Sequence, residues 1–299
     1  MRNLRHKALL FALCGVTHGL CAQRYATEVF SGAQVIVTPD VPYGSNIDFL
    51  NSDFSDPEVA ASEVIQLQYF VSNQIPVPLT FFDTASTSTF VKLVEVRMDV
   101  YQPDQSIDCE EGRPLFIYLH TGELLPPPLN GTPNGTRKDS SAVEASMRMA
   151  RRGYVAVSMS YRLGWEPQAP DLETRRRTYL NATYRAMHDL KQCVRTLKGA
   201  PGTYHIDAQK VIVCGEGTGG NIALMAATLD EPGELFIEKF IPDQAEPEVG
   251  YVDTTIAGTP DGFNGQLDLY RPNGYDGDFA FCVNIGGALA DTSWLAPGD

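Results

Sequence analysis

The stretch Val211–Asp230 reads VIVCGEGTGGNIALMAATLD. Its apolar start, VIVC, predicts a buried strand, and NIALMAATLD predicts a helix. The Gly-rich turn between them gives the layout of a nucleophile elbow, in which a strand turns sharply into a helix and presents the central residue of a Gly-x-Ser-x-Gly motif. Here the motif reads Gly-Glu-Gly-Thr-Gly. Gly217 therefore stands at the nucleophile position, where it offers no side chain.

Strands and helices alternate on both sides of this turn. Apolar or alternating runs predict strands, and amphipathic runs between them predict helices. We expect strands in 91–103, 113–120, 153–161, 210–217 and 279–288, and helices in 140–154, 173–199 and 221–230. This order is typical of a mostly parallel sheet with helices on both faces. Arg113–His120, Gly153–Tyr161 and Val211–Cys214 are predicted to be neighbouring parallel strands.

Ligands of such sheets bind at the carboxyl ends of the strands. We therefore expect Thr121–Leu125, Arg162–Trp165 and Glu216–Gly219 to form the mouth of a pocket. The spacing Gly215-x-Gly217-x-x-Gly220 also fits a dinucleotide fingerprint, but that motif belongs in the first strand–helix unit, and here two such units precede it. Nucleotide binding is therefore not favoured, and no cofactor or metal is expected.

The first 22 residues begin with Arg2, Arg5 and Lys7, continue with an apolar run, and end at Ala22. This pattern predicts a signal peptide and a secreted or periplasmic protein. No later run reaches the length of a membrane span. Residues 23–90 contain short β-like runs, such as Ala33–Val37 and Leu67–Val71, and are expected to form a β-like extension.

The composition limits the kinds of partner that this protein can bind. The chain of 299 residues has 43% apolar and 20% charged residues, which indicates a globular protein. Its net charge of −14 repels phosphate backbones and argues against nucleic acid as a partner. Among the four cysteines after the signal peptide, Cys214 and Cys282 are expected to be buried thiols, and a Cys109–Cys193 bridge is one of the pairings that the sequence leaves open.

Four motifs in order resemble secreted bacterial carboxylesterase-like proteins of the α/β-hydrolase superfamily. LFIYLHTGELLPPPLNG resembles their strand and His-Gly-Gly oxyanion loop, and GYVAVSMSYRLGW their next strand with its Tyr-Arg-Leu-Gly signature. NATYRAMHDLKQCVRTLK resembles the helix before the elbow, and IDAQKVIVCGEGTGGNIALMAA the elbow itself. The resemblance covers about Val91 to Asp230 and is weaker near Phe279–Trp294. It implies an α/β-hydrolase fold over 91–299, with residues 231–278 as a cap insertion.

The resemblance also implies roles for individual residues. Backbone N–H groups of Thr121, Gly122 and Thr218 would form an oxyanion hole, which stabilises the tetrahedral intermediate of ester hydrolysis. His120 would shape the oxyanion loop and would not act as the base. Tyr161 and Arg162 would pack and anchor the next loop. Asp189 would be a salt-bridge partner, because the acid of this superfamily follows the nucleophile in the chain.

Two departures from the family pattern set the functional hypotheses. The nucleophile position is Gly217, and no histidine follows it in the chain. The chain also resembles a truncated one, because the segment that carries the late acid and histidine of this superfamily is not in it. The neighbouring Thr218 and Glu216 are weak candidates for a replacement nucleophile.

Three hypotheses follow from these departures. The chain is a carboxylic-ester hydrolase by family chemistry that is inactive as given. Alternatively it is a non-catalytic secreted module that binds a small ester, lipid or glycan. In the third hypothesis it is part of a larger secreted protein.

Overall fold

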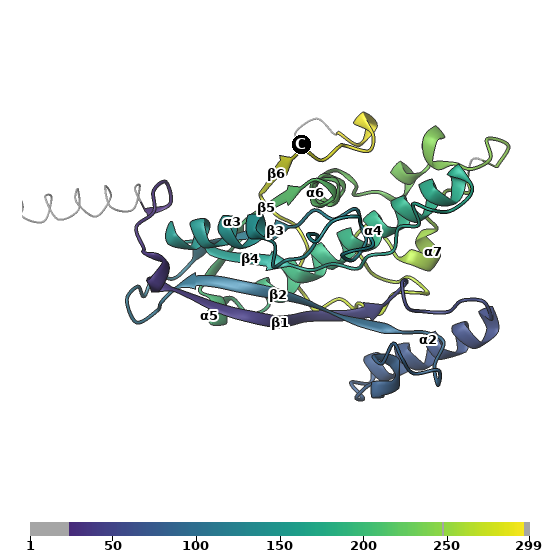
Figure 1. The fold of residues 1–299 in the computed structure, drawn as a ribbon, viewed down its shortest axis with the longest axis horizontal. Helices are drawn as coiled ribbons and strands as arrows, with labels where there is room; N and C mark the ends of the chain where they lie inside the picture. The colour runs from purple at the N-terminus through teal and green to yellow at the C-terminus, as the bar shows by residue number, and fades with distance from the viewer. Residues whose placement is uncertain (1–23, 247, 296–299) are drawn as a thin grey trace, which may run out of the picture.

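The computed structural model describes residues 24–246 and 248–295, so the signal peptide predicted for 1–22 lies outside the described residues. A six-stranded sheet with the order β1-β2-β4-β3-β5-β6 forms its centre (Figure 1). The strands are β1 Val35–Ile47, β2 Leu93–Pro103, β3 Arg113–Leu119, β4 Val155–Met159, β5 Ile206–Glu216 and β6 Phe281–Ile285.

The parallel strands predicted from their apolar runs are confirmed. β4, β3, β5 and β6 are mutually parallel, and Ile117 of β3 is in register with Val157 of β4 and Val213 of β5. All three of these side chains are fully buried, as expected for strands covered on both faces. β1 and β2 run antiparallel and extend the sheet at one edge.

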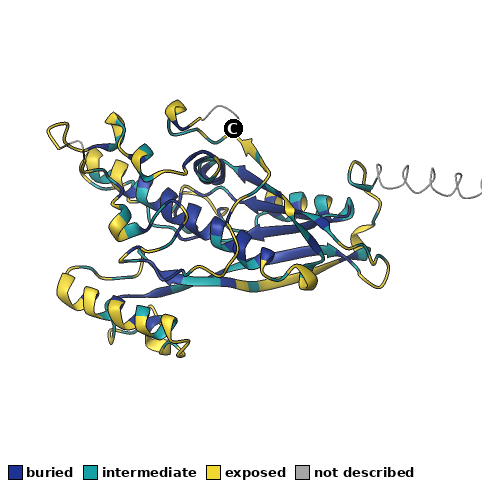
Figure 2. Ribbon diagram, turned by 180° about the vertical axis from the view of Figure 1, so that it is seen from behind, coloured by how far each residue is buried: buried dark blue, intermediate teal, exposed yellow. Residues whose placement is uncertain are grey.

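Helices cover both faces of the sheet. α3, Ser140–Arg151, packs on one face against Phe116, Tyr118 and Ala156. α4, Leu172–Lys198, and α6, Thr218–Thr228, pack on the opposite face. Figure 2 shows the burial concentrated in the central strands of the sheet and in α4. The other α-helices within residues 24–246 and 248–295 are α2 Pro57–Ser72, α5 Pro201–Tyr204 and α7 Thr254–Ala257.

The N-terminal segment differs from the predicted β-like extension. β1 does pair with β2 along most of its length, but the run Leu67–Val71, predicted as β-like, lies inside helix α2. This helix begins after Asp56, whose side chain accepts a hydrogen bond from Val59 N, and it has Pro57 in its first turn. Its buried residues, Ala60, Val64 and Leu67, recur at helical spacing and decide its conformation.

The cysteines are reduced throughout the described part of the chain. Cys109 is exposed, whereas Cys193 is fully buried in the core, with its Sγ 3.8 Å from Met98 Sδ. The Cys109–Cys193 pairing is therefore not formed. Cys214 is buried, as expected, and Cys282 is half-buried on β6.

Strand β6 forms one edge of the sheet. Phe281, Val283 and Ile285 point to one face, because side chains alternate along a strand, and they are 66%, 42% and 50% exposed. Ile212, which is in register with Phe281, packs in the cluster under α3, so this is the α3 side of the sheet. The described residues leave that part of the face open to solvent.

A buried ion pair joins the end of β4 to α4. Asp189 of α4 is fully buried and accepts hydrogen bonds from Arg162 N at 2.6 Å and Arg162 Nε at 2.8 Å. The Tyr270 hydroxyl donates to the same carboxylate at 2.7 Å. Asp189 and Arg162 thus have the anchoring roles expected of them.

Removal of this carboxylate leaves the Arg162 guanidinium buried without its partner. We expect Asp189→Ala to lower the free energy of unfolding by about 3–5 kcal/mol, measured by urea denaturation. Glu144→Ala removes the partner of Arg148 in an exposed pair and should leave the unfolding curve almost unchanged. Equal stability of the two variants would contradict an anchoring role for Asp189.

His188, one residue before Asp189, is fully buried, and its ring meets Tyr184 edge-on with centroids 4.4 Å apart. Burial lowers the pKa of His188 well below its usual value, and Arg162, Lys191 and Arg195 lower it further. Burial also lowers the pKa of His120. Both imidazoles are therefore neutral in the folded protein at neutral pH.

These depressed pKa values predict the sign of the pH dependence of stability. Below about pH 6.5 these two imidazoles bind protons in the unfolded chain but not in the folded chain. Their contribution to the free energy of unfolding is therefore fully present above that pH and is lost as the pH falls. We expect His188→Leu to weaken the loss between pH 7 and pH 5, measured by urea denaturation at each pH. Leu190→Ala, at a buried apolar position of the same helix, serves as the control: it should lower the free energy of unfolding at every pH and leave the slope unchanged. An unchanged slope in His188→Leu would refute this account.

Candidate functional site

Gly217 joins β5 directly to α6 and has φ 55° and ψ −118°. A positive φ at this point is the strained conformation that a nucleophile elbow imposes on its central residue. Glycine adopts it without a steric penalty. The strand, the sharp turn and the helix thus form the elbow predicted from the sequence, with glycine at its apex.

The elbow lies against the end of β3. A Cβ atom on Gly219 would come within 3.0 Å of the carbonyl oxygens of Leu119 and His120. Only glycine permits this approach of the first turn of α6 to the β3 backbone. The approach brings together the predicted oxyanion loop, which begins at Thr121, and the elbow.

The Thr121 side chain fills the space in which a nucleophile would begin. A Cβ atom on Gly217 would lie within 3.0 Å of Thr121 Oγ1 and 3.1 Å from Thr121 Cβ. The side chain of any residue at position 217 would therefore point into the Thr121 hydroxyl. The elbow and the oxyanion loop fit each other only because residue 217 has no side chain.

The backbone N–H groups assigned to the oxyanion hole have the freedom that this role requires. In residues 24–246 and 248–295, no hydrogen bond uses the N–H of Thr121, Gly122 or Thr218. Gly122 has φ +133° and packs on Gly135, where a Cβ atom would lie 2.6 Å from Gly135 Cα. Their joint action on one oxyanion stays a prediction.

His120 and Tyr161 hold the oxyanion loop in place. The rings stack with centroids 4.5 Å apart, and the Tyr161 hydroxyl donates to the His120 carbonyl oxygen at 2.7 Å. His120 Nδ1 donates to its neighbour, the Thr121 carbonyl oxygen, at 2.5 Å. These contacts agree with the loop-shaping role expected of His120 and with the packing role of Tyr161.

Glu216 does not serve the elbow. Its Oε2 accepts hydrogen bonds from the Tyr118 hydroxyl at 2.6 Å and from Ser141 Oγ at 2.9 Å, on the α3 side of the sheet. Burial and the bond to Glu216 raise the pKa of Tyr118. This carboxylate therefore ties β3 and α3 to β5. Thr218, the other candidate, is buried in the first turn of α6.

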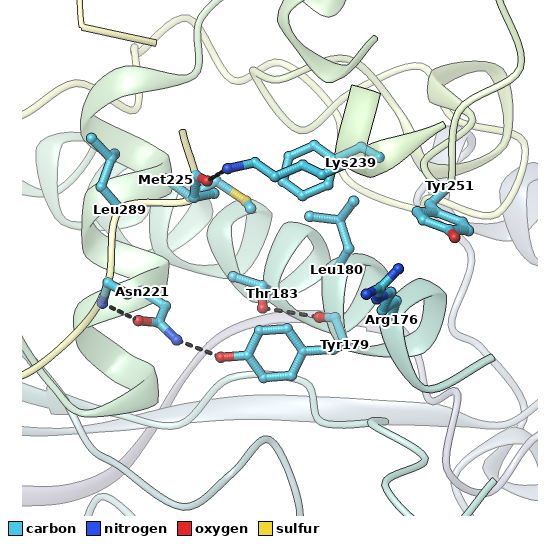
Figure 3. A pocket seen from close by; sticks show the side chains of 12 residues that line it. Arg176, Tyr179, Leu180, Thr183, Asn221, Met225, Lys239, Tyr251 and Leu289 are labelled. Atoms are coloured by element: carbon cyan, nitrogen blue, oxygen red, sulfur yellow. Dashed lines mark hydrogen bonds between the residues drawn. The ribbon is translucent and has the colours of Figure 1, made fainter. Parts of the chain in front are cut away.

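A cavity of about 450 Å³ opens one helical turn beyond the elbow (Figure 3). Asn221 stands between the two: its side chain donates to the Tyr179 hydroxyl and accepts from Ala288 N at 2.6 Å. The wall is mainly apolar. It is formed by Arg176, Tyr179, Leu180, Thr183, Asn221, Met225, Lys239, Phe240, Tyr251, Ala288, Leu289 and Ala290.

These lining residues differ from the loops expected at the pocket mouth. Thr121–Leu125 and Glu216–Gly219 meet at the elbow, but the cavity beside it is built by α4, α6 and two loops that follow α6. Leu289 and Phe240 are distant from the elbow in sequence and belong to no motif, so no local pattern could have indicated them. A search based on motifs could have identified Asn221, which directly follows the glycines of the elbow.

Two cations lie at the wall of this cavity. Lys239 pairs with Asp291 at 2.7 Å and donates to the Ala290 carbonyl oxygen. Arg176 is exposed and forms no ion pair within the described residues. No group of three or more His, Cys, Asp or Glu in the same part of the chain could hold a metal ion. None of its helices has the length and apolar character needed to cross a bilayer.

The parallel strands, the helices on both faces and the elbow after β5 define an α/β-hydrolase fold. A family model, BD-FAE, matches residues 98–252, which is just over half of the 299 residues. The chain belongs to the BD-FAE family. No curated protein matches it.

Several solved structures of esterases are similar to the chain. Esterase 2 of Thermogutta terrifontis, phosphonylated by sarin, is 16% identical over 46% of this chain and 41% of that one, with a TM-score of 0.34. Esterase B of Lactobacillus Rhamnosis is 18% identical over 76% of this chain and 49% of that one, with a TM-score of 0.35. A putative carboxylesterase of Lactobacillus plantarum is 19% identical over 44% and 43%, with a TM-score of 0.31. The chain thus spans less than half of the length of each.

The contact between Gly217 and Thr121 can be tested by mutation. Gly217→Ser should lower the free energy of unfolding by about 1–3 kcal/mol, because a serine at this position would have a positive φ and its side chain would meet Thr121. Thr121→Gly in the same chain should restore part of that loss in urea denaturation. Gly202→Ser, with no atom within 4 Å of its Cβ, is the matched control and should be nearly neutral. Additive effects of the Gly217 and Thr121 changes would contradict the contact.

Proposed function

We propose that this chain is a secreted, non-catalytic member of an ester-hydrolase family that binds a small ligand beside an elbow without a nucleophile. The observation that carries the proposal is the elbow itself. It keeps its backbone shape at Gly217, but the place of the nucleophile is filled by the Thr121 side chain.

Acyl transfer by this fold needs a nucleophile and a base that removes its proton. Gly217 supplies no nucleophile. The histidines near the site do not supply the base: His120 donates from Nδ1 to the Thr121 carbonyl oxygen, and His188 is fully buried on α4. The chain therefore retains the frame of an esterase without the groups that perform the chemistry.

The cavity beside the elbow indicates the class of ligand. Leu180, Met225, Phe240 and Leu289 supply apolar contacts, whereas Asn221 and Thr183 are polar (Figure 3). A few polar groups in a mainly apolar wall suit a small molecule with an apolar body. This wall favours a small ester or lipid over a glycan.

Absence of turnover is the first test. We expect no hydrolysis of 4-nitrophenyl acetate or butyrate by the purified chain above the buffer rate, and no adduct with a fluorophosphonate probe, because the elbow has no nucleophile. Gly217→Ser should remain inactive, since the substitution adds no base. Steady hydrolysis that Thr218→Val abolishes would overturn the proposal and make Thr218 the nucleophile.

Binding without turnover is the second test. We expect 4-nitrophenyl butyrate to bind, detected by saturation-transfer NMR, and Leu289→Trp to weaken it by about tenfold or more by filling the cavity. Leu295→Trp changes an exposed leucine that lines a different pocket and should leave binding unchanged. No binding by the folded wild-type chain would refute a ligand-binding role.

Secretion and the larger-protein hypothesis stay proposals. Both are supported by sequence: the basic and apolar start of residues 1–22, and the absence of a histidine after Gly217 in this chain. N-terminal sequencing of the exported protein and the reading frame downstream of the Asp299 codon test them. A mature N-terminus at Met1 would refute the signal peptide.

A further inference from the structure

A second cavity, of about 370 Å³, lies against another face of α4. It shares Tyr251 with the cavity beside the elbow but is otherwise lined by different residues. Its wall consists of Phe49, Phe54, Gly164, Glu166, Arg177, Thr178, Asn181, Arg185, Tyr251, Asp253, Ile256 and Ala257. The argument for a ligand there begins with Arg185.

Arg185 is a buried cation without an anionic partner. The residue is 8% exposed, and within residues 24–246 and 248–295 its guanidinium forms no ion pair and donates no hydrogen bond. Burying a charge without a partner is costly, so buried cations are normally paired. Arg162, in the loop between β4 and α4, shows the usual case, since Asp189 binds it.

The Phe49 ring covers one face of the Arg185 guanidinium. Its Cζ lies 3.9 Å from the centroid of the Phe49 ring, a cation–π contact. Gly164 also lies close, and a Cβ atom there would be 2.9 Å from Arg185 Nη2. Stacking on one face of a guanidinium leaves its in-plane N–H donors for a planar oxyanion.

The carboxylates that act electrostatically on Arg185, Asp189 and Asp48, already accept hydrogen bonds from other groups. Asp189 binds Arg162 and Tyr270, and Asp48 accepts from Leu50 N at 2.9 Å and Asn51 Nδ2 at 2.6 Å. Burial lowers the pKa of Arg185 to about 9, as does the neighbouring Arg162. This direction is what an uncompensated buried cation produces.

The other polar groups of the wall restrict the ligand further. Thr178 and Asn181 already donate to backbone carbonyl oxygens, of Thr174 and of Tyr251. Two acids, Glu166 and Asp253, form no ion pair in the described part of the chain. They would repel a multiply charged phosphate but can accept hydrogen bonds from hydroxyl groups.

We propose that this cavity binds a small hydroxylated carboxylate, a sugar acid for example, with its carboxylate on the Arg185 guanidinium and its hydroxyl groups toward Glu166 and Asp253. Phe49 and Phe54, whose rings stack with centroids 5.4 Å apart, form an apolar wall beside the bound group. The site is separate from the cavity beside the elbow and does not depend on the function proposed there.

Isothermal titration of the wild-type chain with sodium glucuronate tests the ligand class. We expect saturable binding at least about tenfold tighter than that of glucose, which lacks the carboxylate, in buffers matched in ionic strength with sodium chloride. Inorganic phosphate should bind more weakly than glucuronate. Equal binding of glucose and glucuronate, tighter binding of phosphate, or no binding of glucuronate would overturn the proposal.

Arg185→Met tests the residue, because methionine keeps much of the volume and removes the charge. We expect the dissociation constant of this variant for glucuronate to rise about tenfold or more. Without ligand, the variant should be at least as resistant to urea as the wild type, because it no longer buries an unpaired charge. Arg176→Met, on the same helix but lining the other cavity, should retain binding. Glucuronate binding that survives in Arg185→Met would refute the assignment.

A direct readout covers the case in which Arg185→Met does not fold. The Arg185 Nε–Hε resonance of the ¹⁵N-labelled wild-type chain should shift along the same saturation curve as the titration heat. A resonance that stays fixed while glucuronate saturates the protein would place the ligand elsewhere and overturn the proposal.

Discussion

The close approach of α6 to the ends of the central strands is the constraint on which the rest of the site depends. Gly219 lies against the backbone at the end of β3, and Gly220 lies against Gly287, where a Cβ atom would be 2.9 Å from the Gly287 Cα. No other residue type fits in these places without moving backbone. The glycines thus bring the oxyanion loop, the elbow and the loop after β6 into one small volume.

Glycine at the apex of the elbow determines the energetics of this volume. A serine at the apex of an elbow has a strained backbone that is tolerated because catalysis needs it. Gly217 removes that strain, and Thr121 occupies the released space. The oxyanion loop is consequently held by packing on the elbow as well as by Tyr161 and His120.

Much of the fold could be predicted from the chain because its strands are short apolar runs between amphipathic helices. The parallel strands β3, β4 and β5 and the turn at Gly217 follow from local pattern alone. Helix α2 was missed because its apolar residues LQYFV resemble a strand, although Asp56 and Pro57 form a helix start. The cavities could not be predicted, since Phe49, Arg185 and Tyr251 meet only through the tertiary fold.

The exposed edge at β6 has a consequence for how this protein loses its structure. Phe281, Val283 and Ile285 lie on an apolar strand whose outer edge has no partner among the described residues, and such an edge can template pairing between molecules. On heating, partly unfolded chains that add to such edges are removed from the refolding equilibrium, so the loss of structure would not reverse on cooling. The lifetime of the native chain at high temperature is then set by the rate of unfolding and by protein concentration, rather than by an equilibrium midpoint.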